Sequence, residues 1–177
     1  IDSVDTEIRR LHDLGVKFFY ITNNTSVSSN NYLRKLRAFG LPASEKSIVT
    51  PTKVISKWMK ENKIEKAYIV GTKEFERELF ERCGVVNNKS SPDCVIVGFD
   101  TELNYKKLSK ACNFITLGLP YYLTHVDKNC PTRNGPIPDC GAIGGLIRMT
   151  TNQFHKGHFG KPGDHYIEFL LSLIDKD

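Results

Sequence analysis

A cluster of short hydroxyl and amide side chains follows an apolar run in this sequence. Residues 22–26 read Thr-Asn-Asn-Thr-Ser, directly after the β-branched and aromatic residues of 16–21. In open parallel sheets, ligands bind beyond the carboxyl ends of the strands. A turn of this composition presents hydroxyl, amide and backbone donors to an anion. An ordinary polar loop, whose Asn and Ser side chains bond to their own backbone, explains the same residues, so this segment alone leaves both interpretations open.

A lysine after a glycine offers a second group for an anion. Gly160-Lys161-Pro162 lies between a short apolar tip at Phe159 and a helical pattern. A lysine there would act as a point charge for phosphate, although lysines usually extend to solvent. The histidines show no metal-ligand spacing, and we expect His155 and His158 to be surface residues.

Composition restricts the classes of partner. The chain has 177 residues, with 25 basic and 20 acidic side chains and a formal net charge of +5. Because the basic residues are scattered beside acidic ones and no basic run contains aromatics, we expect a solvated surface and no nucleic-acid partner. The longest apolar run is too short to cross a bilayer, so we expect no membrane partner. Five cysteines without a Cys-x-x-Cys pair predict free thiols in a reducing, cytoplasmic compartment.

Strands alternate with helices along the chain, which predicts a parallel sheet covered by helices on both faces, an α/β fold. The region from His125 to Gly141 is rich in Pro and Gly and is expected to be a loop. Apolar runs predict strands at residues 16–22, 67–71, 94–99 and 121–124. Helical spacing of apolar residues predicts helices near residues 4–14, 32–39, 51–59, 75–83, 105–114, 142–149 and 166–174.

Several stretches in a fixed order carry a family resemblance. Residues 18–26 and 159–162 resemble the second and third sequence motifs of one protein family. Asp93–Asp100, followed by Leu103-Asn104-Tyr105, resembles the signature of that family's cap domain. Residues 123–127 and 138–142 resemble a cap loop that overhangs an active site. Together they resemble the haloacid dehalogenase-like phosphatases, in the branch with a large α/β cap (C2-type) that includes p-nitrophenylphosphatases, phosphoglycolate phosphatases and pyridoxal phosphatases.

The resemblance implies a doubly wound, Rossmann-like parallel-sheet core, incomplete in this chain, with an inserted α/β cap domain. Residues 1–65 and 151–177 would form the discontinuous core and residues 66–150 the cap. The ligand would lie between them, and we expect a homodimer through the cap.

The implied reaction is Mg²⁺-dependent hydrolysis of small phosphate monoesters through an aspartyl-phosphate. By this resemblance Thr22, Asn23 and Lys161 are catalytic, and a small phosphorylated metabolite is the partner. The residues implied to bind the substrate are Asn24, Thr124, His125, Asp127 and Asp139. The family usually has Asn at the position of His125.

Two family motifs are absent from the 177 residues. The first motif of the family, Asp-x-Asp-Gly, which supplies the nucleophile, does not occur. The fourth motif, Gly-Asp followed by a second Asp, is also missing, since Gly163-Asp164 follows Lys161 too closely to replace it. Since Ile1 and Asp177 both fall inside helix-like patterns, we expect both ends to be cut and the nucleophilic Asp to lie outside these residues, which would then hold no metal ligand. A catalytically inactive, truncated phosphate-binding or interaction module is the alternative. An unrelated flavodoxin-like or nucleotide-binding domain is disfavoured because its phosphate fingerprints are absent.

Overall fold

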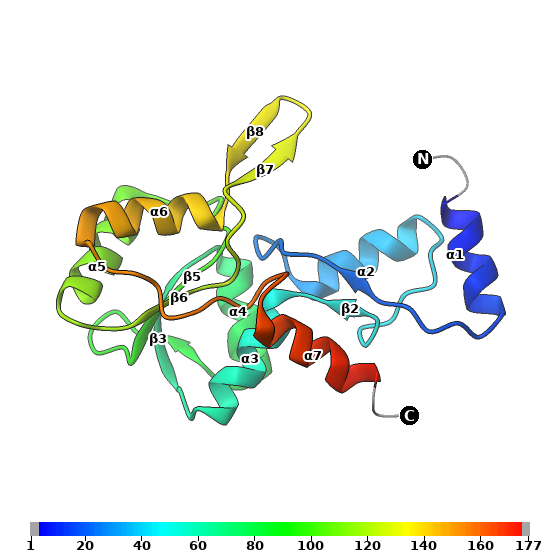
Figure 1. The fold of residues 1–177 in the computed structure, drawn as a ribbon, viewed down its shortest axis with the longest axis horizontal. Helices are drawn as coiled ribbons and strands as arrows, with labels where there is room; N and C mark the ends of the chain where they lie inside the picture. The colour runs from blue at the N-terminus through cyan, green and yellow to red at the C-terminus, as the bar shows by residue number, and fades with distance from the viewer. Residues whose placement is uncertain (1–3, 175–177) are drawn as a thin grey trace.

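The computed structural model describes residues 4–174 (Figure 1). The helices of this part are α1 (Val4–Asp13), α2 (Ser29–Ala38), α3 (Pro51–Glu61), α4 (Lys73–Cys83), α5 (Tyr105–Thr116), α6 (Cys140–Thr151) and α7 (Asp164–Ile174). The strands are β1 (Tyr20–Ile21), β2 (Ile48–Val49), β3 (Lys66–Val70), β4 (Val86–Asn87), β5 (Cys94–Val97), β6 (Tyr121–Leu123), β7 (Asn129–Thr132) and β8 (Gly135–Pro138).

The main sheet is parallel throughout, with strand order β4-β3-β5-β6. Its register places Ile69 opposite Ile96 and Val97 opposite Leu123. Parallel neighbours need crossover connections, and α4 and α5 supply two of them. The α/β architecture with a parallel sheet is therefore confirmed.

The two faces of the main sheet are buried in separate apolar clusters. Along β3, Ala67 and Ile69 belong to a cluster that includes residues of α3 and α4, whereas Tyr68 and Val70 belong to one with α5 and α6. Successive side chains of a strand point to opposite faces, so one short strand contributes to both clusters. Figure 1 shows the helices on either side of this sheet, which explains why β3 and β5 are apolar at nearly every position.

The strand predicted over residues 16–22 is much shorter in the structure. Only Tyr20 and Ile21 form β1, which pairs with β2, and Val16 and Ile21 are exposed. The backbone N–H of Tyr20 donates to Ser47 and that of Thr22 donates to Val49. The prediction of a long buried strand was wrong because β2, which the sequence did not predict, offers a ladder only two residues long.

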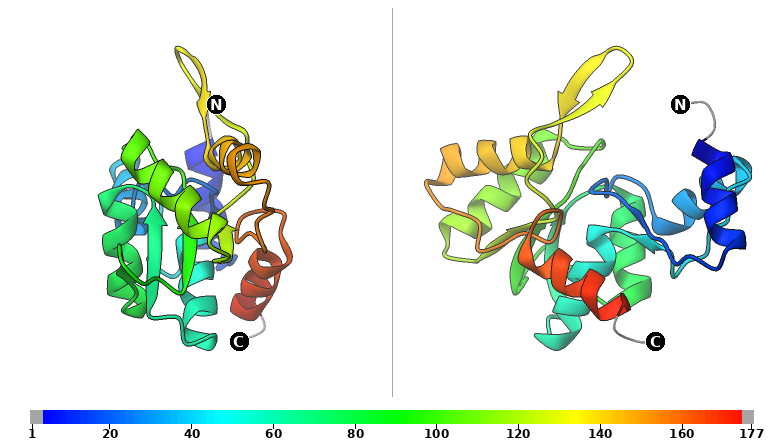
Figure 2. Two further views of the ribbon diagram at one scale, coloured as in Figure 1. Left: turned by 90° about the vertical axis from the view of Figure 1, so that its left-hand side faces the viewer. Right: turned by 45° about the vertical axis from the view of Figure 1, so that its right-hand side comes forward.

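The loop predicted between His125 and Gly141 contains an antiparallel hairpin, β7–β8, which projects from the body in both views of Figure 2. Three prolines in ten residues argue against strands, and this signal misled the prediction. Gly135 has φ 107°, a backbone conformation that suits glycine at the turn. The following helix begins at Cys140, earlier than predicted, because Asp139 caps it.

The segment from Lys156 to Phe159 runs along the free edge of β6. The N–H of Lys156 donates to Tyr121, the N–H of Leu123 donates to Gly157, and the N–H of Phe159 donates to Leu123. This parallel pairing brings the chain to Lys161. His155 and His158, expected at the surface, are instead half-buried, and the Nδ1 atom of each is buried without a hydrogen-bond partner among the described residues.

The division into a core and a cap at residues 65/66 and 150/151 stays a prediction. One apolar cluster joins Val54 of α3 and Phe159 to Ile69 of β3, so residues from both predicted parts pack together. Among residues 4–174, no helix is sufficiently long and apolar to span a membrane.

Candidate functional site

The polar loop, residues 22–26, leaves β1 with part of its hydrogen bonding satisfied internally. The N–H of Asn24 donates to Thr22 Oγ1 at 3.1 Å, and the N–H and hydroxyl of Ser26 both donate to Asn24 Oδ1 at 2.8 Å. These are the local bonds that the ordinary-loop interpretation requires. Thr22 Oγ1 is the acceptor in its bond with Asn24, so this bond does not use the hydroxyl proton of Thr22.

Asn23 connects the polar loop with two distant segments. Its Oδ1 accepts the backbone N–H of Lys161 at 2.8 Å, and its Nδ2 donates to the Lys161 carbonyl at 3.2 Å. The same Nδ2 donates to Asp127 Oδ2 at 3.0 Å. The fold thus brings together three residues that the resemblance assigned to the site, although 138 positions separate Asn23 from Lys161.

Gly160 lies where no side chain fits. A Cβ at this position would be 2.4 Å from the Cβ of His125 and 2.9 Å from both Asn23 Oδ1 and the Thr124 carbonyl. Contacts this short require the backbone to move. The absence of a side chain at residue 160 therefore lets the lysine turn, defined as residues 160–161, pack directly against the polar loop and the end of β6.

Lys161 itself is half-buried, and its main chain is held at both the N–H and the carbonyl. Among residues 4–174, no carboxylate lies within ion-pair distance of its ammonium group. A lysine with a fixed backbone and an unpaired ammonium is suited to bind an anion beside the polar loop.

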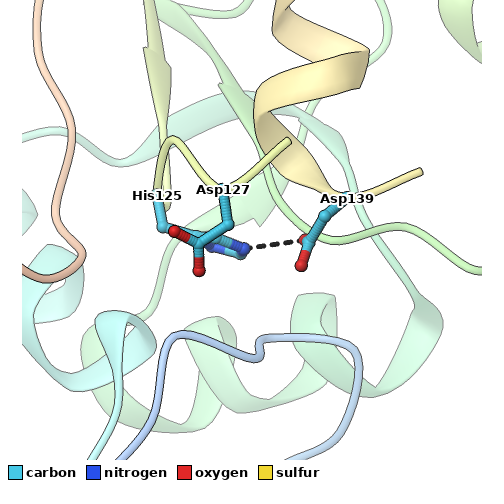
Figure 3. Close-up of side chains that lie close together, drawn as sticks. All are labelled: His125, Asp127 and Asp139. Carbon is cyan, nitrogen blue, oxygen red and sulfur yellow. Dashed lines mark hydrogen bonds and ion pairs between the residues drawn. The ribbon is translucent and has the colours of Figure 1, made fainter. Parts of the chain in front are cut away.

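Three residues predicted to bind substrate are buried and bonded to protein. The side chains of Thr124 and His125 are fully buried and Asp139 is 5% exposed, whereas Asp127 is exposed. His125 Nδ1 lies 3.0 Å from Thr124 Oγ1, and its Nε2 lies 2.7 Å from Asp139 Oδ1, the bond drawn in Figure 3. Contact between these residues and a substrate stays a prediction, and of the four only Asp127 is accessible in this structure.

The donor atoms of His125, Asp127 and Asp139 all lie within 4.8 Å of one another, the one such group of three found among the described residues. Mg²⁺ prefers an octahedral set of oxygen ligands. Here one donor is an imidazole that already bonds to Asp139, and Asp127 already accepts from Asn23. The group therefore does not fit Mg²⁺.

Thr25 is a buried member of the site to which sequence analysis gave no role. Its hydroxyl oxygen accepts the backbone N–H of Phe99 at 3.0 Å and lies 3.3 Å from Thr124 Oγ1. Its position in the polar loop, three residues after Thr22, was the available signal. The residue that pairs with it, Thr124, is 99 positions away and could not be identified from spacing.

A hollow with a volume of about 1110 Å³ lies elsewhere, between α2, α3 and α4. Basic and acidic side chains alternate around it, including Lys53, Glu78 and Arg82. Burial, together with the nearby charge of Arg82 and against the opposing effects of Glu45 and Glu78, lowers the pKa of Lys53 to about 8. None of Thr22, Asn23 or Lys161 lines this hollow.

Comparison with known proteins gives matches along most of the chain. A family model described as haloacid dehalogenase-like hydrolase matches residues 1–85. The 5'-nucleotidase YutF of Bacillus subtilis is 26% identical over 170 residues, which cover 96% of this chain and 66% of that protein. The acid sugar phosphatase of Staphylococcus aureus (strain USA300) is 26% identical over 181 residues, which cover 100% of this chain and 68% of that protein. The chain thus spans about two thirds of the length of these curated relatives.

A solved structure supports the same grouping. The 4-nitrophenylphosphatase of Thermotoga maritima superposes with a TM-score of 0.93 at 29% identity, covering 100% of this chain and 68% of that one. The similarity therefore includes the polar loop, the lysine turn and the sheet between them.

Proposed function

Because the chain belongs to the haloacid dehalogenase-like hydrolases, we propose that it is the phosphoryl-binding part of a phosphatase that hydrolyses small phosphate monoesters. The observation that carries this proposal is the double bond of Asn23 to the main chain of Lys161. This contact places hydroxyl and backbone donors of the polar loop and a lysine around one region. The names of the relatives, which include a 5'-nucleotidase and an acid sugar phosphatase, support a phosphorylated metabolite as the substrate.

In the proposed reaction, a carboxylate oxygen attacks phosphorus while the ester P–O bond breaks. The alcohol leaves with a proton from a second carboxyl group of the same motif, which takes a proton back from the water that attacks in the next step. Water then attacks the aspartyl-phosphate, which releases inorganic phosphate and restores the carboxylate. Phosphoryl transfer spreads charge over the equatorial oxygens, so catalysis depends mainly on positioning and neutralisation. The attacking carboxylate is proposed to come from an Asp-x-Asp-Gly motif, which these 177 residues do not contain.

The residues present would serve this reaction as donors. Thr22 would donate its hydroxyl to a phosphoryl oxygen, the backbone of Asn23 would add a further donor, and Lys161 would neutralise the phosphoryl group. A preorganised donor of this kind contributes about 3 kcal/mol to the lowering of the barrier. Magnesium dependence and a cytoplasmic location belong to the proposal, as does a homodimer through residues 66–150.

The test is Mg²⁺-dependent hydrolysis of p-nitrophenyl phosphate by the natural protein, together with binding of inorganic phosphate to the 177-residue chain. We expect turnover that Lys161→Ala abolishes, and phosphate binding that the same substitution weakens. Lys156→Ala is the matched control, because Lys156 is an exposed lysine of the same segment. The absence of both turnover and phosphate binding would contradict the proposal.

A binding module without catalysis is the second candidate. It is favoured by one observation: the polar loop and the lysine turn are present, whereas no Asp-x-Asp-Gly occurs. Phosphate binding without any turnover by the natural protein would support this candidate. Turnover that depends on Lys161 would exclude it.

A further inference from the structure

A continuous row of buried hydrogen bonds leads from the backbone of Phe99 to the carboxylate of Asp139. The N–H of Phe99 donates to Thr25 Oγ1 at 3.0 Å, and Thr25 Oγ1 lies 3.3 Å from Thr124 Oγ1. Thr124 Oγ1 lies 3.0 Å from His125 Nδ1, and His125 Nε2 lies 2.7 Å from Asp139 Oδ1. Each of these residues is 5% exposed or less, so water has little access to the bonds.

The carboxylate at the end of this row determines which partner donates and which accepts in each of its hydrogen bonds. Asp139 Oδ1 also accepts the backbone N–H of Cys140 at 2.6 Å, and an ionised carboxylate can only accept. The proton between His125 and Asp139 therefore belongs on Nε2 of His125. In a neutral imidazole with Nε2 protonated, Nδ1 is an acceptor, so Thr124 must donate to it. Thr124 then accepts from Thr25, and Thr25 accepts from Phe99.

The opposite tautomer fails at the Asp139 end of the row. If Nδ1 of His125 carried the proton and Nε2 did not, Nε2 would face the accepting Oδ1 of Asp139 at 2.7 Å with no proton between them. The threonines alone would not decide the tautomer, because Cys140 Sγ, 3.6 Å from Thr124 Oγ1, is a second and weaker acceptor for the Thr124 hydroxyl.

The row ends in the polar loop, beside the groups proposed to bind phosphate. Thr25 is three residues from Thr22, and Gly160 of the lysine turn packs on the Cβ of His125 and the Thr124 carbonyl. We propose that His125 and Asp139 are positioning residues: Asp139 holds His125 in the Nε2–H tautomer, and the directed row of bonds fixes the polar loop against the lysine turn. The functional part of this inference rests on the proposed phosphate site, whereas the tautomer does not.

The tautomer is tested by ¹⁵N NMR of the histidine side chains in the 177-residue chain, with His125→Asn to identify the His125 signals. We expect the wild-type protein to show protonated Nε2 and unprotonated Nδ1, and Asp139→Asn to lose this pattern, since an amide can also donate to Nε2. A protonated Nδ1 in the wild-type protein, or an unchanged tautomer in Asp139→Asn, would overturn the proposal. If Asp139→Asn does not fold, the wild-type tautomer still decides this part.

The positioning role is tested by binding of inorganic phosphate to threonine variants. Thr25→Val removes the hydroxyl and is expected to weaken phosphate binding about tenfold, the equivalent of one unpaired buried group. Thr25→Ser keeps the hydroxyl and should restore the affinity. Thr150→Val, an exposed threonine of α6, is the matched control and should bind as the wild type does.

The outcomes separate the two proposals. Equal loss of affinity in Thr25→Val and Thr25→Ser would show that packing, and not the hydroxyl, positions the loop, and would overturn the inference. If the wild-type chain binds no phosphate, the proposed function fails, while the NMR result still decides whether Asp139 sets the tautomer of His125.

Discussion

The side-chain amide of Asn23 forms two hydrogen bonds with the main chain of Lys161, accepting from its N–H at 2.8 Å and donating to its carbonyl at 3.2 Å. An asparagine side chain carries both an acceptor and donors, so it can satisfy both backbone groups of one residue. A serine or an aspartate in the same place would satisfy fewer of them. The position of the lysine turn therefore depends on the chemical type of residue 23.

Asn23→Ala is expected to destabilise the protein by about 1–3 kcal/mol, because it leaves the N–H of Lys161 without its partner. Phosphate binding should weaken in parallel, since the lysine turn loses its link to the polar loop. Urea unfolding and phosphate titration measure the two effects. Asn30→Ala is the control, because Asn30 is exposed on α2. Equal stability of the two variants would contradict the prediction.

Asn23→Asp keeps the hydrogen-bond acceptor of residue 23 and removes its hydrogen-bond donor. The new carboxylate can still accept from Lys161, but it would face Asp127 at the place where Nδ2 now lies 3.0 Å from that carboxylate. Two carboxylates at this distance repel, so the variant should be less stable than Asn23→Ala at pH 7. Its deficit should shrink as the pH falls below about 5, where one carboxyl becomes protonated. Urea unfolding at pH 7 and pH 4.5 checks this, and a deficit independent of pH would exclude the repulsion.

Gly160→Ala should destabilise the protein by about 1–3 kcal/mol through overpacking. The added Cβ would meet the Cβ of His125 at 2.4 Å and backbone and side-chain oxygens at 2.9 Å. Gly157→Ala, three residues earlier, is the control, because its nearest neighbour would be a ring carbon of Tyr122 at 3.9 Å. Thermal unfolding of the two variants should differ clearly, and similar melting temperatures would show that the turn adapts to a side chain.

Lys53→Met is expected to stabilise the protein at pH 7. Burial lowers the pKa of Lys53 from 10.5 to about 8, and its side chain is 11% exposed. At about 1.4 kcal/mol per pKa unit, holding the charged form in the folded state costs at most about 3 kcal/mol. The gain is reduced by the lost hydrogen bond from its ammonium to the Glu45 carbonyl.

The pH dependence of this effect has a definite sign. Below pH 8 Lys53 is protonated in both states, so its cost is fully present; between pH 8 and 10.5 only the unfolded state keeps the proton, and the stability of the parent rises relative to that of Lys53→Met. Urea unfolding of both proteins at pH 7 and pH 9.5 measures the difference. Lys57→Met, at a half-exposed position on α3, serves as the control and should show no such trend.

The cysteines should differ in reactivity. Burial raises the pKa of Cys94 to about 12 and that of Cys140 to about 11, so both remain thiols at pH 8. Cys83 and Cys130 are partly exposed. Iodoacetamide at pH 8, followed by peptide mass spectrometry, should modify Cys83 and Cys130 in the native protein and all five cysteines in urea. Native labelling of Cys140 as fast as in urea would contradict the burial of the α6 start.

The strands and helices of the main sheet could be predicted from the sequence because their signals are local. The run from Cys94 to Val97 is buried on both faces, and the start of α3 is marked by Thr50, whose side chain accepts the N–H of Lys53. The length of β1 could not be predicted in this way, since it depends on β2, whose two β-branched residues are too short a run to indicate a strand.

For the candidate site, the sequence indicated some of the residues that lie together, while their roles stay predictions. Asn23, Asp127 and Lys161 come together as the resemblance implied. The burial of His125 was not predictable, because a polar side chain is tolerated in the interior only when partners are supplied, and Asp139 is a partner 14 residues away across a hairpin.

The attachment of residues 156–159 to the edge of β6 has a mechanical consequence. Phe159 is bonded to Leu123 of the sheet, and two residues later Lys161 is bonded to Asn23 of the polar loop. The lysine turn is thus anchored to the sheet on one side and to the polar loop on the other, so a displacement of either part would change the position of Lys161.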